Sequence, residues 1–273
     1  MKYEFFTNEN YVSKVHHISA SEKILRGKTD PHFHEFFEIE LITEGNGRHE
    51  INGNEKELKK GSIYFLPPGN FHRIFCTPEL NVINIMFDES IISSELQAKL
   101  LDSSASLCAV FNEKELSDVI AIAKQLIEEI NAPDNYTAHY SANLLDCILM
   151  KIMRKAEVLP FSDIKGRYAA INTAINYLYK NFKDAPTLDE LAKTCGYSPN
   201  YFRKLFVELT GKCYTDFVNA LKVSYAKVLL ASNNMTVSEI AFDCGFTSLS
   251  NFYRVFHSET GHSPLEYRNK IAP

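Results

Sequence analysis

The stretch Thr187-Leu-Asp-Glu-Leu-Ala-Lys-Thr-Cys-Gly-Tyr, continued by Ser198-Pro-Asn-Tyr-Phe-Arg-Lys-Leu-Phe, decides the fold of the C-terminal part because the chain repeats it. The second copy is Thr236-Val-Ser-Glu-Ile-Ala-Phe-Asp-Cys-Gly-Phe, followed by Thr247-Ser-Leu-Ser-Asn-Phe-Tyr-Arg-Val-Phe. Identical residues recur 49 positions later at Thr187, Glu190, Ala192, Cys195 and Gly196, and 50 positions later at Phe202, Phe206, Thr210 and Gly211. Self-similarity at a fixed spacing predicts a duplicated structural unit.

Each copy carries the local signals of two short helices joined by a tight turn. A Thr and a Glu three residues apart form a capping box, which starts a helix. A Gly at the helix end allows the left-handed turn, and a Ser starts the next helix. These parts are Thr187 with Glu190 and Thr236 with Glu239, Gly196 and Gly245, Ser198 with Pro199 and Ser248, and Phe202 with Phe206 and Phe252 with Phe256 as core anchors. The pattern predicts two helix-turn-helix units in an all-α region.

Two further helices complete the predicted helical region. Residues 215–232 form a continuous helical pattern between the copies, and Ser263 with Glu266 forms a third capping box that opens a final helix. A rigid connector holds the two units at a fixed separation. Major-groove sites on one face of DNA recur every ~34 Å, which is the spacing such a connector has to match.

The second helix of each unit is the one that enters the major groove in DNA-binding proteins. With the phenylalanines pointing inward, the outward residues are Asn200, Arg203 and Lys204 in the first copy and Ser250, Asn251 and Arg254 in the second. Arg bonds guanine bidentately and Asn does the same with adenine. The sequence therefore predicts these six residues as the DNA-binding set, while phosphate contact or plain solvent exposure stays open for each of them.

Residues of about 168–270 resemble the DNA-binding domain of the AraC/XylS family of bacterial transcription regulators. The resemblance rests on Gly245-Phe246, Ser248, Phe252, Arg254 and Phe256, and on the ending Gly261-His262-Ser263-Pro264-Leu265-Glu266-Tyr267-Arg268. It implies a transcription activator that binds double-stranded DNA as a homodimer and contacts RNA polymerase. The short pair Leu249-Ser250 departs from the family pattern, and we expect weaker base contact there.

The N-terminal part has a different periodicity. Short alternating runs between about Lys14 and Met86 are separated by turn signals, which predicts many short strands in a sandwich or barrel. Asn52-Gly53 lies between two such runs, and this dipeptide is typical of a tight hairpin because both residues accept positive φ.

Helical periodicity returns after Asp88. Residues 113–130 and 140–153 each carry an apolar stripe, and a polar link with Pro160 and Gly166 follows. We therefore expect an α+β protein with a cupin-like barrel in residues 1–110, a helical pair in 111–160 and the DNA-binding domain in 167–273. The helical pair either covers its own barrel or forms a dimer interface.

Two stretches of the N-terminal part resemble the two motifs of the cupin barrel. They are His32-Phe-His34-Glu-Phe-Phe-Glu38 and Gly61-Ser-Ile-Tyr-Phe-Leu-Pro67-Pro-Gly69-Asn-Phe-His72. AraC-type regulators often carry such a barrel to bind a small effector. The matching positions in cupin enzymes bind a divalent metal. The candidate effector-binding residues are His32, His34, Glu38, Glu40 and His72, and the candidate metal ligands are His32, His34, Glu38 and His72.

The residue chemistry fits both interpretations of this site. His32, His34, Glu38 and Glu40 share one face of an extended segment by the two-residue period. Three imidazoles and a carboxylate suit Fe, Mn, Ni or Zn, and the same polar groups suit a small polar effector such as a carbohydrate. His72 after Pro-Pro-Gly is also compatible with a simple turn residue. The alternatives to a regulator are a metal-dependent cupin enzyme with a helical appendage, and an interaction protein that uses residues 113–153.

Charge is distributed unevenly along the 273 residues. The net charge is −5, but residues 167–273 carry 12 Lys and Arg against 9 Asp and Glu, whereas residues 1–166 carry 17 against 25. The mildly basic C-terminal part is compatible with DNA binding without requiring it. The sequence has no apolar run long enough for a membrane span and no signal-peptide pattern. Six cysteines without C-x-x-C spacing favour reduced thiols in a cytoplasmic protein. The family resemblance implies a regulator that is not an enzyme.

Overall fold

The computed structural model describes residues 4–6, 8–13, 16–93, 96, 106–159, 167–232 and 235–271. The chain divides into two units, residues 1–172 and 173–273, with the division inside helix α5 (Arg167–Asn181). All the described strands belong to the first unit, and the second unit is helical. The predicted α+β class is therefore confirmed, while the roles assigned to residues 1–110, 111–160 and 167–273 remain predictions.

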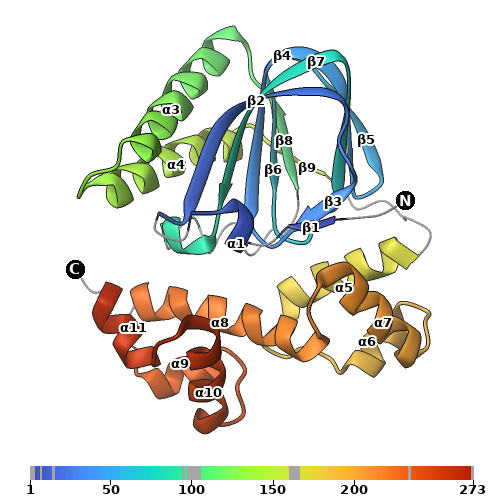
Figure 1. Cartoon of the computed structure of the whole chain (residues 1–273), viewed down its shortest axis with the longest axis vertical. Coiled ribbons are helices and arrows are strands. Elements are labelled where there is room, and N and C mark those ends of the chain that lie inside the picture. Colours follow the sequence, from blue (N-terminus) through green and yellow to red (C-terminus); the bar gives the residue numbers. More distant parts are fainter. Residues whose placement is uncertain are drawn as a thin grey trace. The chain divides into compact units, whose positions relative to one another are not determined.

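Figure 1 shows the elements of both units. The first unit contains β1 (Glu4–Phe6), α1 (Asn8–Tyr11), β2 (Ile18–Lys28), β3 (His32–His34), β4 (Phe37–Ile51), β5 (Asn54–Leu58), β6 (Ser62–Leu66), β7 (His72–Phe87), a 3₁₀ turn (Glu89–Ile91), β8 (Leu107–Val110), α3 (Glu113–Asn131), α4 (Thr137–Met153) and β9 (Glu157–Val158). After α5 come α6 (Leu188–Thr194), α7 (Pro199–Thr210), α8 (Tyr214–Ser232), α9 (Val237–Asp243), α10 (Leu249–Thr260) and α11 (Pro264–Ile271).

The described strands form one sheet in the order β1-β3-β7-β4-β6-β8-β9, with β2 added on β7 and β5 on β4. The pairings are antiparallel except for the parallel pair of β1 and β3. The sheet curls on itself (Figure 1). The long strand β7 lies between β2 and β4 and pairs with both. Most of this sheet lies in the predicted strand region, whereas β1, β8 and β9 come from segments that the alternation did not indicate.

The hairpin predicted at Asn52-Gly53 is present between β4 and β5. Asn52 has φ 49° and Gly53 has φ 78°, so both residues adopt the left-handed conformation that a primed turn needs. The two strands pair from Gly47 with Leu58 to Ile51 with Asn54. The turn chemistry of two residues therefore sets the register of this hairpin.

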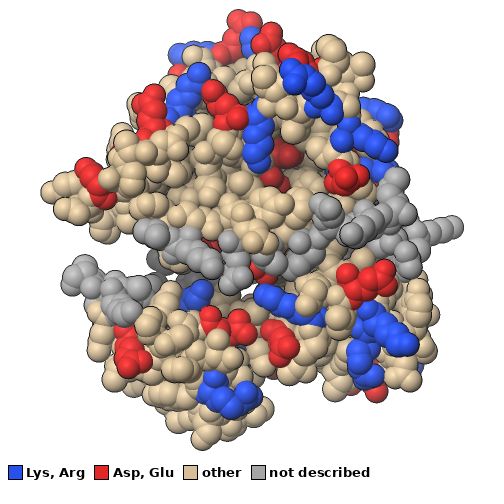
Figure 2. Space-filling view, viewed as in Figure 1, with Lys and Arg blue, Asp and Glu red and all other residues tan. Residues whose placement is uncertain are grey.

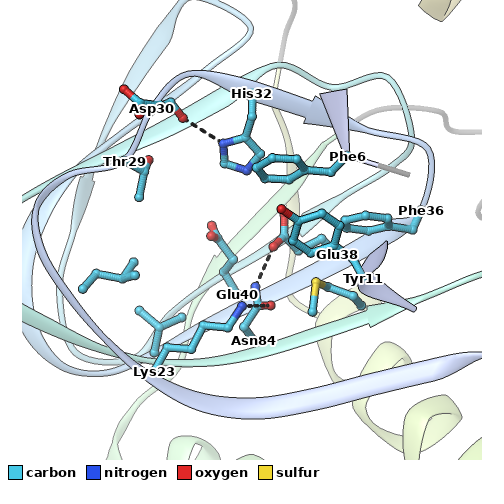
Figure 3. A pocket seen from close by; sticks show the side chains of 13 residues that line it. Phe6, Tyr11, Lys23, Thr29, Asp30, His32, Phe36, Glu38, Glu40 and Asn84 are labelled. Carbon is cyan, nitrogen blue, oxygen red and sulfur yellow. Dashed lines mark hydrogen bonds between the residues drawn. The ribbon is translucent and has the colours of Figure 1, made fainter. Parts of the chain in front are cut away.

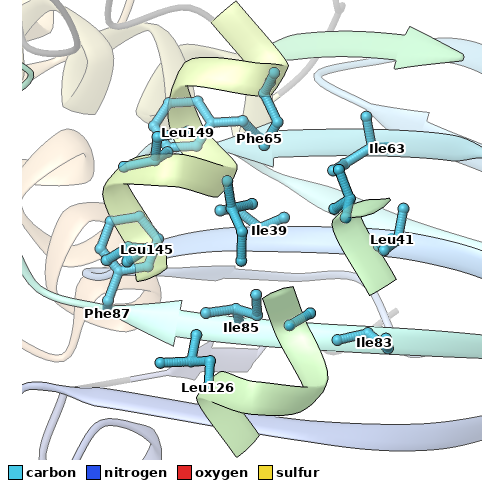
Figure 4. Close-up of a cluster of buried hydrophobic side chains, with 14 of the residues drawn as sticks. Ile39, Leu41, Ile63, Phe65, Ile83, Ile85, Phe87, Leu126, Leu145 and Leu149 are labelled. Carbon is cyan, nitrogen blue, oxygen red and sulfur yellow. The ribbon is translucent and has the colours of Figure 1, made fainter. Parts of the chain in front are cut away.

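The first part of strand β4, residues 37–42, is buried on both faces, and the two faces carry different kinds of side chain. Ile39 and Leu41 point to the outer face of the sheet, where they join a large apolar cluster with α3 and α4. Leu126 of α3 and Leu145 and Leu149 of α4 pack on this face (Figure 4). The alternation sends Glu38 and Glu40 to the opposite, inner face. The two helices thus cover their own sheet. Helix α3 begins at the predicted residue, Glu113, and α4 begins at Thr137, three residues before its predicted start.

The second unit contains two helix pairs with matching ends: the first helix pair is α6 with α7, and the second is α9 with α10. The capping boxes of Thr187 and Thr236 are both formed. Gly196 and Gly245 follow each first helix at φ 76° and 79°. In both pairs the N–H groups of this glycine and of the residue after it donate to carbonyl oxygens in the last turn of the first helix, which is the Schellman arrangement. One difference appears at the second helix, because Ser248 accepts a bond from Asn251 whereas Ser198 makes no side-chain cap.

Helix α8 joins the two pairs and is tied to the second. The ammonium of Lys222 on α8 donates to the carbonyl oxygen of Gly245 at 2.5 Å. The backbone of Lys183, just after α5, lies close to Gly245. A Cβ atom on Gly245 would be only 2.1 Å from the carbonyl oxygen of Lys183. Gly245 therefore serves both as a left-handed turn and as a close-approach point. The equivalent Gly196 has the same conformation but open space around it.

Two general expectations concern the chain as a whole. All six cysteines are free, as their spacing predicts. Across the parts of the chain that the structure describes, none of the helices combines the length and the apolar character that crossing a membrane requires.

The two glycines provide a matched pair of variants. Gly196→Ala places a side chain at positive φ in open space, and we expect a loss of about 1–2 kcal/mol in the free energy of unfolding of the helical unit. Gly245→Ala adds overpacking of about 1–3 kcal/mol against Lys183 to that strain. Urea unfolding followed by far-ultraviolet circular dichroism measures both. Equal losses for the two variants would contradict the close approach.

Candidate functional site

A cavity of about 240 Å³ opens into the first unit on the inner face of the sheet. Its wall combines recessed polar side chains with aromatic and aliphatic ones (Figure 3). The lining residues are Phe6, Tyr11, Lys23, Leu25, Thr29, Asp30, His32, Phe36, Glu38, Glu40, Val82, Asn84 and Met86. A concave apolar wall with a few convergent polar groups is typical of a small-molecule site.

Strand register brings the polar groups of this cavity together. Glu40 pairs with Asn84 across β4 and β7, and neighbouring side chains of paired strands share a face. His32 on β3 pairs with His72 at the start of β7. The five residues predicted for the effector site, His32, His34, Glu38, Glu40 and His72, are thereby gathered around one end of the barrel interior.

Glu38 is the centre of the group. Its Oε2 atom lies 3.1 Å from Nε2 of His34 and 3.2 Å from Nε2 of His72. Its Oε1 atom accepts a hydrogen bond of 2.6 Å from Asn84, whose own oxygen accepts from the ammonium of Lys23 at 2.9 Å (Figure 3). A chain of polar contacts thus runs from the surface cation of Lys23 to the buried imidazoles.

The contacts between Glu38 and the two imidazoles are close but are not hydrogen bonds. Nε2 of His34, Nε2 of His72 and Oε2 of Glu38 are all buried, and each lacks a hydrogen-bond partner among the described residues. Nδ1 of His34 bonds the carbonyl oxygen of Phe36 at 2.7 Å, and a carbonyl only accepts, so Nδ1 carries the proton. In a neutral ring the Nε2 lone pair of His34 therefore faces the carboxylate.

The two buried carboxyl groups have opposite pKa shifts. Burial alone would raise the pKa of Glu38, but the positive charge that the imidazoles of His34 and His72 can carry, at 3.1 and 3.2 Å, holds it well below its usual range. Burial, and then the charge of Glu38, raises the pKa of Glu40 well above its usual range. The surroundings of Glu38 therefore favour its ionised form, and those of Glu40 favour its protonated form. The imidazoles of His32, His49 and His72 all have lowered pKa values, chiefly because of burial, with His32 at about 3.

Three residues of this site were not found from the sequence. His49 of β4 is fully buried and its Nε2 lies 3.1 Å from Nδ1 of His72 and 3.4 Å from Oε2 of Glu40. Lys23 and Asn84 complete the polar chain at the mouth. Lys23 and Asn84 depend on strand pairing over long distances. His49 lies an odd number of residues after Glu38 and Glu40, and register shifts in β4 separate it from them, so simple alternation does not predict that it shares their face.

Aromatic rings cover the mouth of the cavity. Phe6 lies 4.6 Å from the ring of His32 and stacks on Tyr11 at 4.4 Å. The ring of Phe36 stacks on His34 at 4.4 Å. Faces of aromatic rings beside polar groups suit a ligand that has one apolar face and several hydroxyl groups.

The DNA-binding candidates lie on the second helices of the two helix pairs. Five of the six side chains are exposed and Asn251 is partly buried. The anchors Phe202, Phe206, Phe252 and Phe256 are fully buried beneath them. Arg203 donates to Asn200 at 3.1 Å, and Arg254 donates to Asn251 at 2.8 Å.

Two exposed tyrosines accompany these residues and were not predicted. Tyr201 on α7 is 43% exposed and Tyr253 on α10 is 41% exposed. Their exposure could have been predicted from the same helical period that turns Phe202 and Phe252 inward. On the face shown in Figure 2, Lys and Arg are interspersed with Asp and Glu on both units, in line with the small basic excess of the C-terminal part.

Comparison with known families identifies both parts of the chain. Residues 22–150 match the model of the AraC-like ligand binding domain, and residues 191–270 match that of a helix-turn-helix domain. The chain belongs to the AraC family of transcription regulators. Regulators of this family bind DNA and small-molecule effectors, which assigns the barrel and the helical unit their general roles.

Similar curated proteins that match along most of both chains are transcriptional activators. The activator RhaS of Escherichia fergusonii is 24% identical over 257 residues, which are 92% of this chain and 91% of that protein. The activator RhaR of Salmonella dublin is 21% identical and covers 98% of this chain and 95% of its own. Among solved structures, ToxT of Vibrio cholerae aligns over 96% of this AraC-family chain and 100% of its own, with 14% identity and a TM-score of 0.43.

Opposite ionisation of the two carboxyl groups predicts opposite tolerance to amide substitution. Glu40→Gln replaces a neutral acid, and we expect its free energy of unfolding near pH 7 to change by less than about 1 kcal/mol. Glu38→Gln removes a charged acceptor and is expected to cost about 1–3 kcal/mol. Urea unfolding of the two variants provides the comparison. A larger loss for Glu40→Gln would show that Glu40 is the ionised member.

Proposed function

We propose that this chain is a one-component transcription activator in which a small polar effector enters the barrel and alters how two helix-turn-helix units engage DNA. The observation that carries the proposal is the presence of a polar cavity in one unit and, in the other, of two helix pairs that begin with the same capping box. An effector shifts the protein between two states only through a difference in its affinity for them.

The helix pairs support DNA binding through α7 and α10. Each of these helices is held by buried phenylalanines on one side and presents an Asn and an Arg on the other. Helix α8 has 19 residues, which corresponds to a length of about 28 Å. A connector of that size is comparable with the ~34 Å spacing of successive major grooves on one DNA face.

The effector that the cavity suits best is a small carbohydrate. Its volume of about 240 Å³ is below the range usual for drug-sized ligands. Lys23, Asn84 and the neutral acid Glu40 supply polar groups for hydroxyls, and the rings of Phe6 and Tyr11 supply an apolar face. We therefore propose a monosaccharide or similar polyol.

The same cluster also fits a divalent metal ion: His32, Glu38 and His72 offer ligand atoms within 4.8 Å of one another, and we propose His34, whose Nε2 atom lies 3.1 Å from Glu38, as a fourth ligand. Donors around an ion at about 2.1 Å are about 3.0–3.4 Å from one another, which is close to the separations of 3.1 and 3.2 Å around Glu38. The unsatisfied nitrogen and oxygen atoms there are the atoms that such an ion would satisfy. A bound ion would supply a Lewis-acidic centre for effector oxygens. We propose this role in ligand binding and not in catalysis, since the similar curated proteins are activators.

Two partners follow from the same proposal. The small basic excess of the helical unit favours a homodimer, in which two chains share the DNA contacts. Tyr136, Tyr140 and Met150 are exposed apolar side chains on or beside α4 that such a dimer would cover. Activation then requires contact with RNA polymerase, which we propose on the basis of family membership.

DNA binding is tested with a target selected from random duplexes and measured by fluorescence anisotropy at several salt concentrations. We expect Arg254→Ala to weaken binding to the selected target by about 1–3 kcal/mol, because a bidentate base contact is lost. Lys114→Ala removes one exposed charge from the barrel unit and is the matched control, with no change expected. An equal loss on every sequence would assign Arg254 to phosphate contact, and salt-independent binding by the wild type would refute the function.

Effector binding is tested by thermal unfolding with a panel of monosaccharides and polyols. A ligand present at 100 times its dissociation constant stabilises the protein by about 2.7 kcal/mol. We expect one member of the panel to do so for the wild type and not for Lys23→Met, which keeps the aliphatic stem but removes the ammonium. Stabilisation by apolar acids alone would contradict the proposed effector class.

A further inference from the structure

His49 contacts the Nδ1 side of the His72 ring, whereas Glu38 lies on the Nε2 side of that ring. It is fully buried, and its ring contacts that of Tyr64 edge-on at 4.6 Å. Its Nε2 atom makes a hydrogen bond of 3.1 Å with Nδ1 of His72. His49 belongs to neither cupin-like motif of the sequence, yet it is the residue that contacts the far side of a candidate ligand.

The two nitrogens of His72 have contacts of different kinds. Nδ1 has an aligned hydrogen bond with His49. Nε2 lies 3.2 Å from Glu38 without hydrogen-bond alignment. A neutral imidazole carries one proton and one lone pair. When Nε2 gives its lone pair to an ion, Nδ1 must carry the proton and needs an acceptor.

We propose that His49 is the positioning residue of the metal centre: by accepting the Nδ1 proton of His72, it holds the Nε2 lone pair toward the ion. The inference rests on the proposed ion at His32, His34, Glu38 and His72. His34 is held in the same way by the carbonyl of Phe36, and His32 by the carbonyl of Asp30 at 2.9 Å. All three imidazoles then have an acceptor behind them, as metal-bound histidines generally do.

A competing arrangement places an ion directly on His49. Glu40, His49 and His72 also offer ligand atoms within 4.8 Å of one another. The geometry favours the positioning role because the contact between His49 and His72 is an aligned hydrogen bond, which an ion between them would break. The contacts around Glu38 have no such bond to lose.

The test is a titration of the metal-free full-length chain with Co²⁺, followed by the visible absorption bands that report the coordination of the ion. His49→Phe keeps a ring beside Tyr64 but removes the acceptor, and we expect it to weaken Co²⁺ binding about 10–100-fold with the band positions unchanged. His49→Gln offers an amide oxygen to Nδ1 of His72 and should recover part of that affinity. His34→Ala removes a proposed ligand and should change the bands themselves, and His139→Ala, on the surface of α4, is the neutral control.

Each result supports or overturns the inference. Unchanged affinity in His49→Phe overturns it, and so does a change of bands like that of His34→Ala, which would make His49 a ligand. A wild type that binds no Co²⁺ overturns this inference together with the proposed ion, whereas the DNA-binding function stands or falls separately on the anisotropy measurements. Thermal unfolding of both His49 variants shows whether lost affinity reflects a lost fold, in which case Gln would give no recovery.

Discussion

The alternation of side chains along β4 is the constraint on which the N-terminal unit depends. Phe37, Ile39 and Leu41 face outward and are covered by α3 and α4, while Glu38 and Glu40 face into the barrel. A shift of the strand by one residue would bury carboxylates under the helices and leave isoleucines in the cavity. The apolar core and the polar site are therefore two faces of the same strand, and the packing energy of one fixes the geometry of the other.

Two carboxyl groups on one buried face create an electrostatic conflict, because neighbouring charges of the same sign disfavour each other in a medium of low polarity. The structure resolves it unequally. The contacts of Glu38 with His34, His72 and Asn84 favour its charged form, whereas Glu40 has no hydrogen bond to its Oε2 among the described residues and burial favours its protonated form. One negative charge surrounded by imidazoles is a suitable host for a cation, and a neutral acid beside it can donate a hydrogen bond to a ligand. The asymmetry thus places two carboxyl groups of different character in one cavity.

How far the sequence could predict these features depends on the range of the interaction. The capping boxes of Thr187 and Thr236 and the Asn52 turn involve residues within a few positions of one another, and their pattern predicts them. The cluster of His32, His34, Glu38 and His72 could be predicted because two spaced motifs mark it. His49, Lys23 and Asn84 could not, since β7 is placed beside both β2 and β4 by pairings between distant residues, the most distant of which joins Ile18 to Phe87. Local sequence patterns do not determine such long-range closures.

The two helix pairs share a framework but differ in how they present their polar residues. The extra residue in the second turn shifts the repeat from 49 to 50 positions, so Phe202 corresponds to Phe252 and Asn200 to Ser250. The hydrogen-bonded pair of Asn200 with Arg203 is nevertheless matched by Asn251 with Arg254, one position further along the helix. One position is a rotation of about 100° around a helix of 3.6 residues per turn. Under the proposed function, the shared framework and the rotated polar pairs would present the two units to DNA bases at different angles, so the two base sequences that they contact need not be alike.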